Sequence, residues 1–452
     1  MRNSFFPSSG LQTLLARNKN VEMSQFYTAL RWLGVAALVI AGVVVFILYF
    51  RGTFRDRIEY KIKNVPAPRD PRFPLALASL SNSVTTSGRL TGFWVESEAI
   101  NAARLAAIRS AQQAIHFETF FMTPGRRVND LADALIERAQ AGVEVEIVVD
   151  QYGAKKLSRR YWRRLRAAGI NIHFYNDFNW KAPVDYFART HRKLLLIDGK
   201  VGLIGGAGIS DYWDGRDNIQ DTGPWYDFEM RWEGEVVAAL EGMFMQHWTY
   251  VRGTADLDPQ IFNPLPNDDA IVLITAGDDP SYRASSVRAL FQVSISAAKQ
   301  RIWIASPYFI PDENLQTELV SAKNNGIDVR ILTNGSQCDK KFVYYASCEL
   351  YGDLLKAGVK IYEYQPSMMH AKALLLDNYW VSSGSANFDP RSFFHNDELD
   401  ISSADEQLVQ NIEQFFLKGF TRSEQIDRTQ WRKRPIWQRI VGRVVLFFQS
   451  QL

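Results

Sequence analysis

The longest apolar run in the chain lies near its N-terminus. From Trp32 to Phe50 the sequence WLGVAALVIAGVVVFILYF contains no charged residue, and Arg31 and Arg51 flank it. A helix of this length just crosses a hydrocarbon core of roughly 30 Å. A cleaved signal peptide would have a shorter apolar region, and a soluble core helix is rarely apolar on every face. The pattern therefore predicts a transmembrane helix at 32–50 after an N-terminal tail at 1–31.

The segment after this helix, residues 51–91, is basic at first and then rich in proline. Four prolines stand close together, at Pro66, Pro68, Pro71 and Pro74. Proline lacks the backbone N–H that helices and sheet ladders use, so this stretch predicts a spacer. We expect the folded region to begin near Gly92 and to continue to about residue 425.

Beyond the spacer, runs with helical periodicity alternate with short β-branched runs. In RVNDLADALIERAQAG, Leu131, Leu135 and Ala139 recur at helical spacing, and Gly142 suits a helix end. The next run, EVEIVV, is typical of a strand. This alternation predicts an α/β fold with a parallel or mixed sheet covered by helices.

The same order of segments occurs twice. The matching pairs are 114–122 with 301–309, 142–150 with 326–334, 165–175 with 354–364, and 191–208 with 370–387. Repeats of this length are whole domains rather than the short units of a solenoid. We therefore expect duplicated domains at 92–255 and 256–425, followed by a tail at 426–452.

That tail is basic and amphipathic. In WRKRPIWQRIVGRVVLFF (431–448), arginines and Lys433 alternate with large apolar residues. A helix of this kind can lie on anionic lipid. The alternative, a terminal helix docked on its own domain, has the same periodicity and stays open.

Composition narrows the function only slightly. The net charge of +3 is too small to indicate a nucleic-acid partner. The two cysteines, Cys338 and Cys348, have no metal-binding spacing and fit a reducing compartment, although a single disulfide between them remains an alternative.

The chemistry is carried by a motif, His-x-Lys-x-x-x-x-Asp, that occurs twice. The first copy is His191, Lys193 and Asp198, and the second is His370, Lys372 and Asp377. A strand places positions i and i+2 on one face, so each His and Lys can point into one site. Each Asp opens a turn sequence, Asp-Gly or Asp-Asn. Two occurrences at equivalent places in a repeat rule out coincidence.

Two histidines and two lysines suit an attack on a phosphodiester. One imidazole can act as nucleophile and the other as acid and base, while the lysines neutralise the nonbridging oxygens. This pattern predicts no need for a divalent metal or other cofactor. Carboxylates on neighbouring strands, Asp227 and Glu398, are candidates to orient the histidines, with ordinary surface salt bridges as the alternative.

These motifs resemble those of the phospholipase D superfamily, in which Gly-Gly or Gly-Ser and then Asn follow the motif. The second copy has Ser385 and Asn387, whereas the first has Gly208 where the family usually has Asn. The resemblance covers roughly residues 95–425. It implies two duplicated α/β/α sandwich domains packed as a pseudo-dimer. Because Gly208 replaces the usual Asn, we expect no Asn contact to phosphate from the first half.

The resemblance also implies roles for the site residues. His191 would be the nucleophile that forms a phosphohistidine, and His370 the acid and base. Lys193, Lys372, Ser385 and Asn387 would bind the phosphate. Asp198 and Asp377 would stabilise the halves rather than react.

Within the superfamily, three segments resemble bacterial cardiolipin synthases: ASPYFIP (305–311), NFDPRSFFHNDELDI (387–401) and RPIWQRI (434–440). Such enzymes would move a phosphatidyl group from phosphatidylglycerol, or from phosphatidylethanolamine, onto phosphatidylglycerol. The expected partners are these lipids and a membrane, with no nucleic acid. The expected location is the bacterial inner membrane, and the basic residues after the helix favour a cytoplasmic catalytic domain. The sequence leaves the oligomeric state open.

Two other functions compete with this one. A hydrolase, either a phospholipase D using water or a membrane-tethered nuclease, would share the chemistry up to the phosphohistidine, although a nuclease needs a broad basic groove that this near-neutral chain lacks. A non-catalytic membrane scaffold is the second alternative, and the two intact His/Lys pairs argue against it.

Overall fold

The computed structural model describes residues 9–50, 62–177, 180, 188–215, 223–255, 269–278, 280 and 284–449. The chain divides into an N-terminal unit, Met1–Arg55, and a catalytic unit that holds nearly all the rest, Asp56–Ser450. The expected limits at residues 51 and 256 fall in segments outside the described residues.

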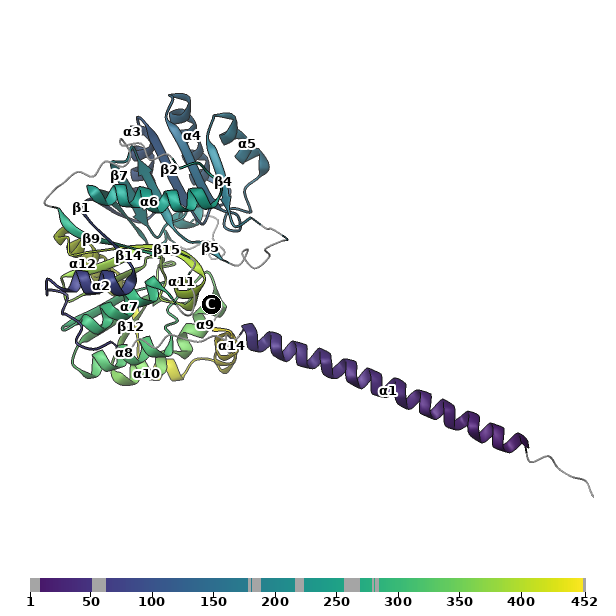
Figure 1. Cartoon of the computed structure of the whole chain (residues 1–452). Helices are drawn as coiled ribbons and strands as arrows, with labels where there is room; N and C mark the ends of the chain where they lie inside the picture. Colours follow the sequence, from purple (N-terminus) through teal and green to yellow (C-terminus); the bar gives the residue numbers. More distant parts are fainter. Residues whose placement is uncertain are drawn as a thin grey trace, which may run out of the picture. The chain divides into compact units, whose positions relative to one another are not determined.

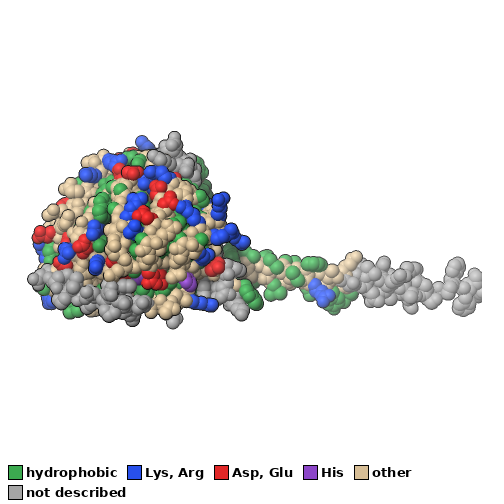
Figure 2. Space-filling view, turned by 90° about the horizontal axis from the view of Figure 1, so that it is seen from above, with side chains coloured by type: hydrophobic (Ala, Val, Ile, Leu, Met, Phe, Trp, Pro, Cys, Tyr) green, Lys and Arg blue, Asp and Glu red, His purple; other side chains and the backbone are tan. Residues whose placement is uncertain are grey.

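The N-terminal unit contains one long helix, α1 (Ser9–Phe50). Its stretch Gln25–Tyr49 has a mean hydropathy of 2.6 and is long and apolar enough to cross a membrane. Figure 2 shows mainly apolar side chains along its described part. A candidate membrane span thus lies where the sequence predicts one, but the helix that contains it begins well before Trp32. Residues 11–33 contain neither Pro nor Gly, so nothing in the predicted tail stops the helix.

The described strands of the catalytic unit form one 16-stranded sheet. In chain order they are β1 (Val84–Val95), β2 (Ala114–Thr119), β3 (Glu144–Asp150), β4 (Asn171–Tyr175), β5 (Arg189–Thr190), β6 (Lys193–Ile197), β7 (Val201–Gly205), β8 (Phe228–Glu233), β9 (Ala270–Gly277), β10 (Arg301–Ala305), β11 (Asp328–Asn334), β12 (Lys360–Tyr364), β13 (Ala373–Leu376), β14 (Trp380–Gly384), β15 (Asn396–Ser403) and β16 (Ser423–Ile426).

The helices of this unit follow the rhythm that the sequence predicts. They are α2 (Phe73–Ser81), α3 (Ser97–Ser110), α4 (Arg126–Gln140), α5 (Arg159–Ala167), the 3-10 helix η2 (Asp211–Asp214), α6 (Glu235–Tyr250), α7 (Ser286–Ala297), α8 (Glu313–Asn324), α9 (Lys341–Glu349), α10 (Tyr351–Ala357), α11 (Pro390–Phe394), α12 (Glu406–Thr421), α13 (Arg428–Arg432) and α14 (Ile436–Phe447).

The sheet has internal symmetry about the antiparallel pair β1 and β9. On one side the strands run β8-β7-β6-β2-β3-β4, and on the other β15-β14-β13-β10-β11-β12, so each half repeats the order of the other. Within each half the last three strands are parallel and the first three antiparallel. The predicted duplicated α/β architecture is confirmed, with one half above the other in Figure 1.

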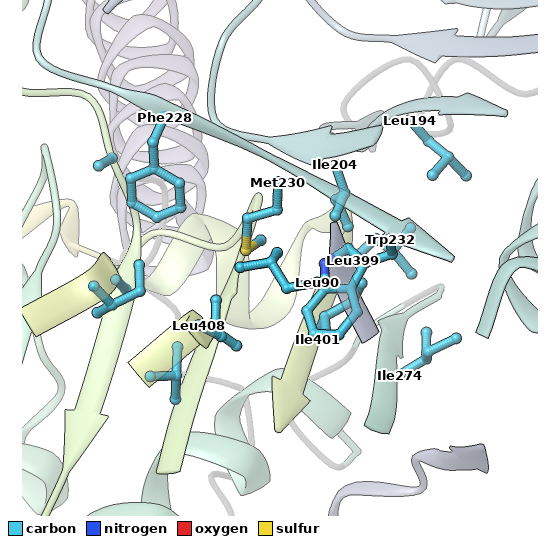
Figure 3. Close-up of a cluster of buried hydrophobic side chains, with 14 of the residues drawn as sticks. Leu90, Leu194, Ile204, Phe228, Met230, Trp232, Ile274, Leu399, Ile401 and Leu408 are labelled. Carbon is cyan, nitrogen blue, oxygen red and sulfur yellow. The ribbon is translucent and has the colours of Figure 1, made fainter. Parts of the chain in front are cut away.

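A single hydrophobic core crosses the boundary between the halves. Helices α6 and α12 cover one face of the sheet over it. Figure 3 shows Phe228 and Met230 from the first half with Leu399 and Ile401 from the second, all in this core. Separate cores under α3 to α5 and under α7 to α10 fill the opposite face. The shared core fixes the two halves against each other, which a site built from both requires.

The predicted spacer is wrong in its second part, because α2 and β1 lie before Gly92. Phe73 and Leu77 of α2 are fully buried in the core under α7. Pro74 stands in the first turn of α2, where the missing N–H has no helical partner to lose. Proline at a helix start and proline in a spacer look alike in sequence, which explains the error.

The C-terminal tail is docked on its own unit, as the alternative expected. Strand β16 pairs antiparallel with β12, and Arg434 binds Glu349 of α9 with 2.9 Å between the charged atoms. The disulfide alternative is wrong, since Cys338 and Cys348 are free and buried.

Candidate active site

Each motif histidine is held through its backbone by the other half of the unit. His191 lies between β5 and β6, and its N–H donates to the carbonyl of Asp397 at 2.8 Å. His370 lies before β13, and its N–H donates to the carbonyl of Tyr226 at 2.8 Å. Strand β5 also pairs with β15 of the second half. The two motifs are therefore positioned at the boundary between the halves.

The orienting carboxylates also come from the opposite half. Glu398 lies 2.9 Å from Nδ1 of His191, and Asp227 lies 3.1 Å from Nδ1 of His370. Both carboxylates are fully buried, so the alternative of a surface salt bridge is wrong. A carboxylate that accepts the Nδ1 proton leaves Nε2 of a neutral imidazole free for chemistry.

Glu398 is itself fixed by three side-chain donors. The hydroxyls of Ser385 and Ser392 donate to it at 2.6 and 2.7 Å, and Asn396 donates at 3.3 Å. The hydroxyl that the sequence assigned to phosphate binding at Ser385 is thus directed at a carboxylate, and its oxygen accepts the N–H of Leu399. The sequence did not single out Ser392 or Asn396.

Asp227 is fixed by a different residue type, the indole of Trp213. Its Nε1 donates to Asp227 at 2.9 Å, and the N–H of Phe228 donates at the same distance. The surroundings also explain Gly208, because a Cβ there would stand 2.7 Å from the carbonyl oxygen of Phe121 and 3.2 Å from the Trp213 indole. The place where the family usually has an Asn side chain is occupied in this half.

The two motif aspartates serve the backbone. Each accepts three successive N–H groups at the start of a neighbouring strand: Asp198 those of Gln112, Gln113 and Ala114, and Asp377 those of Lys299, Gln300 and Arg301. All of these bonds are 2.7 to 3.0 Å long. This geometry fits the expectation that they stabilise the halves.

The lysines and histidines of both motifs share one electrostatic environment. Burial and the charge of Lys193 hold the pKa of His191 well below its usual range, and Lys372 acts in the same direction. Burial and the charge of Lys372 lower the pKa of His370 to about 3, against the opposing effect of Asp227. Both imidazoles are therefore neutral at neutral pH in the free protein.

Burial also changes the charges around the histidines. It lowers the pKa of Lys372 to about 8, and it lowers that of Lys193 and raises that of Glu398. The Oδ1 atom of Asn387 is buried with no hydrogen-bond partner among the described residues. The two buried lysines beside the motif histidines suit an anionic ligand, whereas the Asn387 oxygen, an acceptor, suits a donor such as a hydroxyl.

Aromatic side chains line one side of this region. The rings of Trp213 and Trp225 lie 5.0 and 5.6 Å from that of His370, and Phe120 lies 5.2 Å from His191. Tyr212 and Tyr308 pack on the same cluster as Trp213 and Trp225. Tyr226 and Phe309, by contrast, are core residues: Tyr226 stacks on Tyr364 and Phe415, and Phe309 stacks on Phe388.

A network of buried ion pairs lies behind His191. His247 binds Glu118 at 2.6 Å and approaches Asp397 at 3.4 Å, and Thr190 donates to Glu118 at 2.5 Å. The ligand atoms of His247, Asp278 and Asp397 lie within 4.8 Å of one another, as metal ligands would. The buried guanidinium of Arg192 donates to Asp278, however, and supplies the positive charge there. We assign no metal to this group.

Comparison with known proteins agrees with the geometry. The family model described as "Cardiolipin synthase, PLD-like domain" matches residues 105–213 and 292–419. A cardiolipin synthase of Geobacillus thermodenitrificans is 35% identical over 383 residues, which cover 84% of this chain and 73% of that protein. A probable cardiolipin synthase of Bacillus subtilis, YwiE, is 33% identical over 339 residues, 74% of this chain and 66% of that protein.

The fold also matches a solved structure. The phosphatidylserine synthase of Haemophilus influenzae superposes with a TM-score of 0.63 over 84% of this chain and 99% of that one, at 13% identity. At that identity the likeness concerns the fold alone. The family match covers both halves and both motifs, and the sequence relatives span most of the chain. The chain belongs to the cardiolipin synthase family of phospholipase D-like proteins.

Proposed function

We propose that this chain is a phosphatidyltransferase that makes cardiolipin from phosphatidylglycerol through a phosphohistidine intermediate. The observation that carries the proposal is the pair of buried histidines, each with a carboxylate from the opposite half on Nδ1 and a buried lysine of its own motif beside it. Family membership supports the same reaction class, transfer of a phospholipid's phosphatidyl group.

In the first step His191 attacks the donor lipid. Its Nε2 forms a bond to phosphorus, and the bond from phosphorus to the headgroup oxygen breaks. His370 gives its proton to that oxygen, so the headgroup leaves as a neutral alcohol. Lys193 and Lys372 hold the nonbridging oxygens. The choice of His191 as nucleophile follows the family resemblance.

The acid role of His370 needs a bound substrate. Burial lowers its pKa to about 3 in the free protein, which leaves it neutral. An anionic phosphodiester brought next to it favours the charged imidazolium and raises this pKa. The substrate thus brings its own acid into the correct protonation state, while Asp227 holds the ring.

In the second step a hydroxyl of phosphatidylglycerol attacks the phosphohistidine. His370 now accepts the hydroxyl proton, the new P–O bond forms and the P–N bond to His191 breaks. The products are cardiolipin and the alcohol released earlier, which is glycerol from a phosphatidylglycerol donor and ethanolamine from a phosphatidylethanolamine donor. Water in place of the acceptor would give phosphatidic acid and turn the enzyme into a hydrolase.

The test uses the purified full chain in mixed micelles of phosphatidylglycerol, with and without phosphatidylethanolamine, and mass spectrometry of the lipids. Cardiolipin should form in both, and chelators should not reduce its rate. Phosphatidic acid as the sole product would establish the hydrolase instead. A requirement for added divalent metal would contradict the role given to the lysines.

We further propose that the chain is a single-pass protein of the bacterial inner membrane with its catalytic unit in the cytoplasm. The candidate span and the basic residues on its C-terminal side support this orientation. A membrane-impermeant thiol reagent applied to intact cells should fail to label an exposed cysteine placed at Thr317 of α8. Labelling before the cells are opened would reverse the orientation.

A further inference from the structure

Helix α14 presents a row of large apolar side chains to solvent. Their exposed fractions are 73% for Ile436, 55% for Trp437, 58% for Ile440, 57% for Val444 and 41% for Phe447. These positions recur at helical spacing and form one side of the helix, here named the apolar face of α14. Soluble proteins rarely leave such a contiguous row uncovered, so this face calls for a partner.

The opposite side of α14 is firmly packed, so the exposure does not come from a loose terminus. A Cβ added at Gly442 would stand 2.4 Å from the carbonyl oxygen of Tyr345, which shows how closely α14 approaches α9. Arg434 binds Glu349, and just before α14 the indole of Trp431 donates to the carbonyl of Cys348 at 2.6 Å. The helix is thus held in one orientation with its apolar face outward.

The charges around this face indicate what covers it. The stretch 428–448 contains six basic residues and no Asp or Glu: Arg428, Arg432, Lys433, Arg434, Arg439 and Arg443.

 A basic helix with one apolar side suits the surface of an anionic bilayer. A second copy of the chain would bring the same positive charges against this face and is disfavoured.

The packed side of α14 is connected to the candidate active site. On its packed side, Val445 and Leu446 contact a buried cluster that includes Ile310, and Tyr308 packs on the same cluster. Tyr308 also packs on the aromatic cluster of Trp213 and Trp225 beside His370. A short series of contacts therefore connects α14 to the wall of the site.

The first half contributes a basic surface on the same side of the sheet. Helix α5 follows the carboxyl end of β3, and a cavity of about 580 Å³ beside it is lined by Lys155, Arg159, Arg163 and Arg166 among other residues. The Nζ of Lys156, in the loop before α5, lies 3.4 Å from the hydroxyl of Tyr212, which packs on the aromatic cluster. In Figure 1, α5 lies in the upper half and α14 in the lower half, with β5 between them.

We propose that α14 lies in the surface of an anionic bilayer, with its apolar face among the acyl chains, and so holds the active site against its lipid substrates. Helix α5 adds electrostatic attraction from the other half. The inference rests on the proposed function, because a lipid substrate is what makes this placement useful. The same chain also carries the candidate membrane span.

The test places an environment-sensitive fluorophore on the full chain at Ile440→Cys. The matched control is Leu75→Cys on α2, an apolar residue that is 71% exposed. Both natural cysteines are buried, and labelling of the unmodified chain gives the blank. Each protein is reconstituted into phosphatidylcholine vesicles with or without phosphatidylglycerol, and a nitroxide on the acyl chains serves as quencher.

The probe at position 440 should shift to the blue and be quenched by the nitroxide, more strongly with the anionic lipid and less at high salt. The probe at position 75 should remain in water. Equal behaviour of the two probes overturns the proposal. A blue shift at position 440 that grows with protein concentration and escapes the nitroxide would assign the face to a second copy and also overturn it.

A kinetic comparison separates this inference from the proposed function. The double change Ile440→Glu with Val444→Glu should raise the KM for lipid in vesicles on the order of tenfold, whereas Leu75→Glu should not. Equal thermal stability of both variants would show that the fold is intact. If the unmodified chain made no cardiolipin, the function would fail while the probe result at position 440 still stood.

Discussion

The two halves of the catalytic unit solve one task, the orientation of a histidine, with different side chains. Trp213 and Ser392 stand at equivalent places, each 22 residues after its motif histidine. Each donates to the carboxylate that orients a histidine, the indole to Asp227 and the hydroxyl to Glu398. The large indole donates to the shorter side chain, an aspartate, and the small hydroxyl donates to the longer one, a glutamate. The differences in side-chain size therefore compensate each other.

The glycines of the first half belong to this exchange. A Cβ at Gly206 would stand 2.4 Å from Asp227, whereas its equivalent in the second half, Ser385, donates to Glu398. Gly208 likewise leaves room for the Trp213 indole where Asn387 has a side chain. The departure from the family pattern at Gly208 is therefore part of a coherent local packing, not the decay of one half.

The surroundings of the histidines differ as well. Behind His191 lie the ion pairs of His247, whereas behind His370 the ring of Tyr226 stacks on Tyr364 at 4.9 Å and on Phe415 at 4.1 Å. Equivalent positions in a duplicated fold thus have unlike electrostatic environments. That difference is what two distinct roles in one reaction require.

Replacing the histidines tests the division of roles most directly. We expect His191→Asn and His370→Asn each to reduce kcat on the order of 10⁴-fold, as removal of a nucleophile or its base does elsewhere. With a donor whose leaving group needs no acid, such as a nitrophenyl ester, the His370 variant should accumulate a covalent adduct visible by intact mass. An adduct on the His191 variant instead would exchange the roles.

The orienting carboxylates should have the next largest effect. Asp227→Asn and Glu398→Gln remove the charge that fixes the imidazole and should each lower kcat about 10²- to 10⁴-fold with little change in KM. Steady-state kinetics in mixed micelles measures both, with Glu424→Gln, an exposed carboxylate on β16, as the control. Unchanged kcat in either variant would contradict the role given to that carboxylate.

The alkaline limb of the pH profile should identify a lysine. Burial lowers the pKa of Lys372 to about 8, so its positive charge is lost as pH rises through 8 and kcat/KM should fall. Arginine remains charged in this range, so in Lys372→Arg the limb should move to higher pH even if overall activity drops. The same limb in both proteins would assign it to another group.

The packing of Gly208 against its neighbours gives the prediction with the smallest expected effect and the most specific test. Gly208→Asn should lower stability by about 1–3 kcal/mol, because the new side chain has no room between the Phe121 backbone and Trp213. Combining it with Trp213→Ser, which copies the second half, should recover part of that loss. Thermal unfolding of the two single variants and the double variant gives the coupling between the sites. If the losses in stability of the single variants simply add in the double variant, the two side chains do not compete for the same space.

Much of the fold and of the candidate site could be predicted, because the signals for them are local in sequence. The motif spacing, the repeated segments and the apolar run near the N-terminus each occupy a short window. The pairing of Glu398 with His191 could not be predicted in this way, since the two residues are 207 positions apart and meet only when β5 pairs with β15. Trp213 did leave a signal, because aligning the two repeats places it opposite Ser392.

The error at the spacer has a physical reason too. Residues 73–81 form a helix because Phe73 and Leu77 find a core built mainly from the second half, far away in sequence. No local pattern shows that partner. Proline content alone therefore overstated how far the spacer reaches.

The exchange of carboxylates between halves has a consequence for synthesis of the chain. When the first half leaves the ribosome it carries His191, but the glutamate that orients this ring is still 207 residues from being made. His370 is synthesised after Asp227, and the two side chains meet only when the second half has docked on the first. A growing chain therefore holds no competent imidazole pair, and the surrounding lipids meet a working enzyme only once the last strands of the sheet are in place.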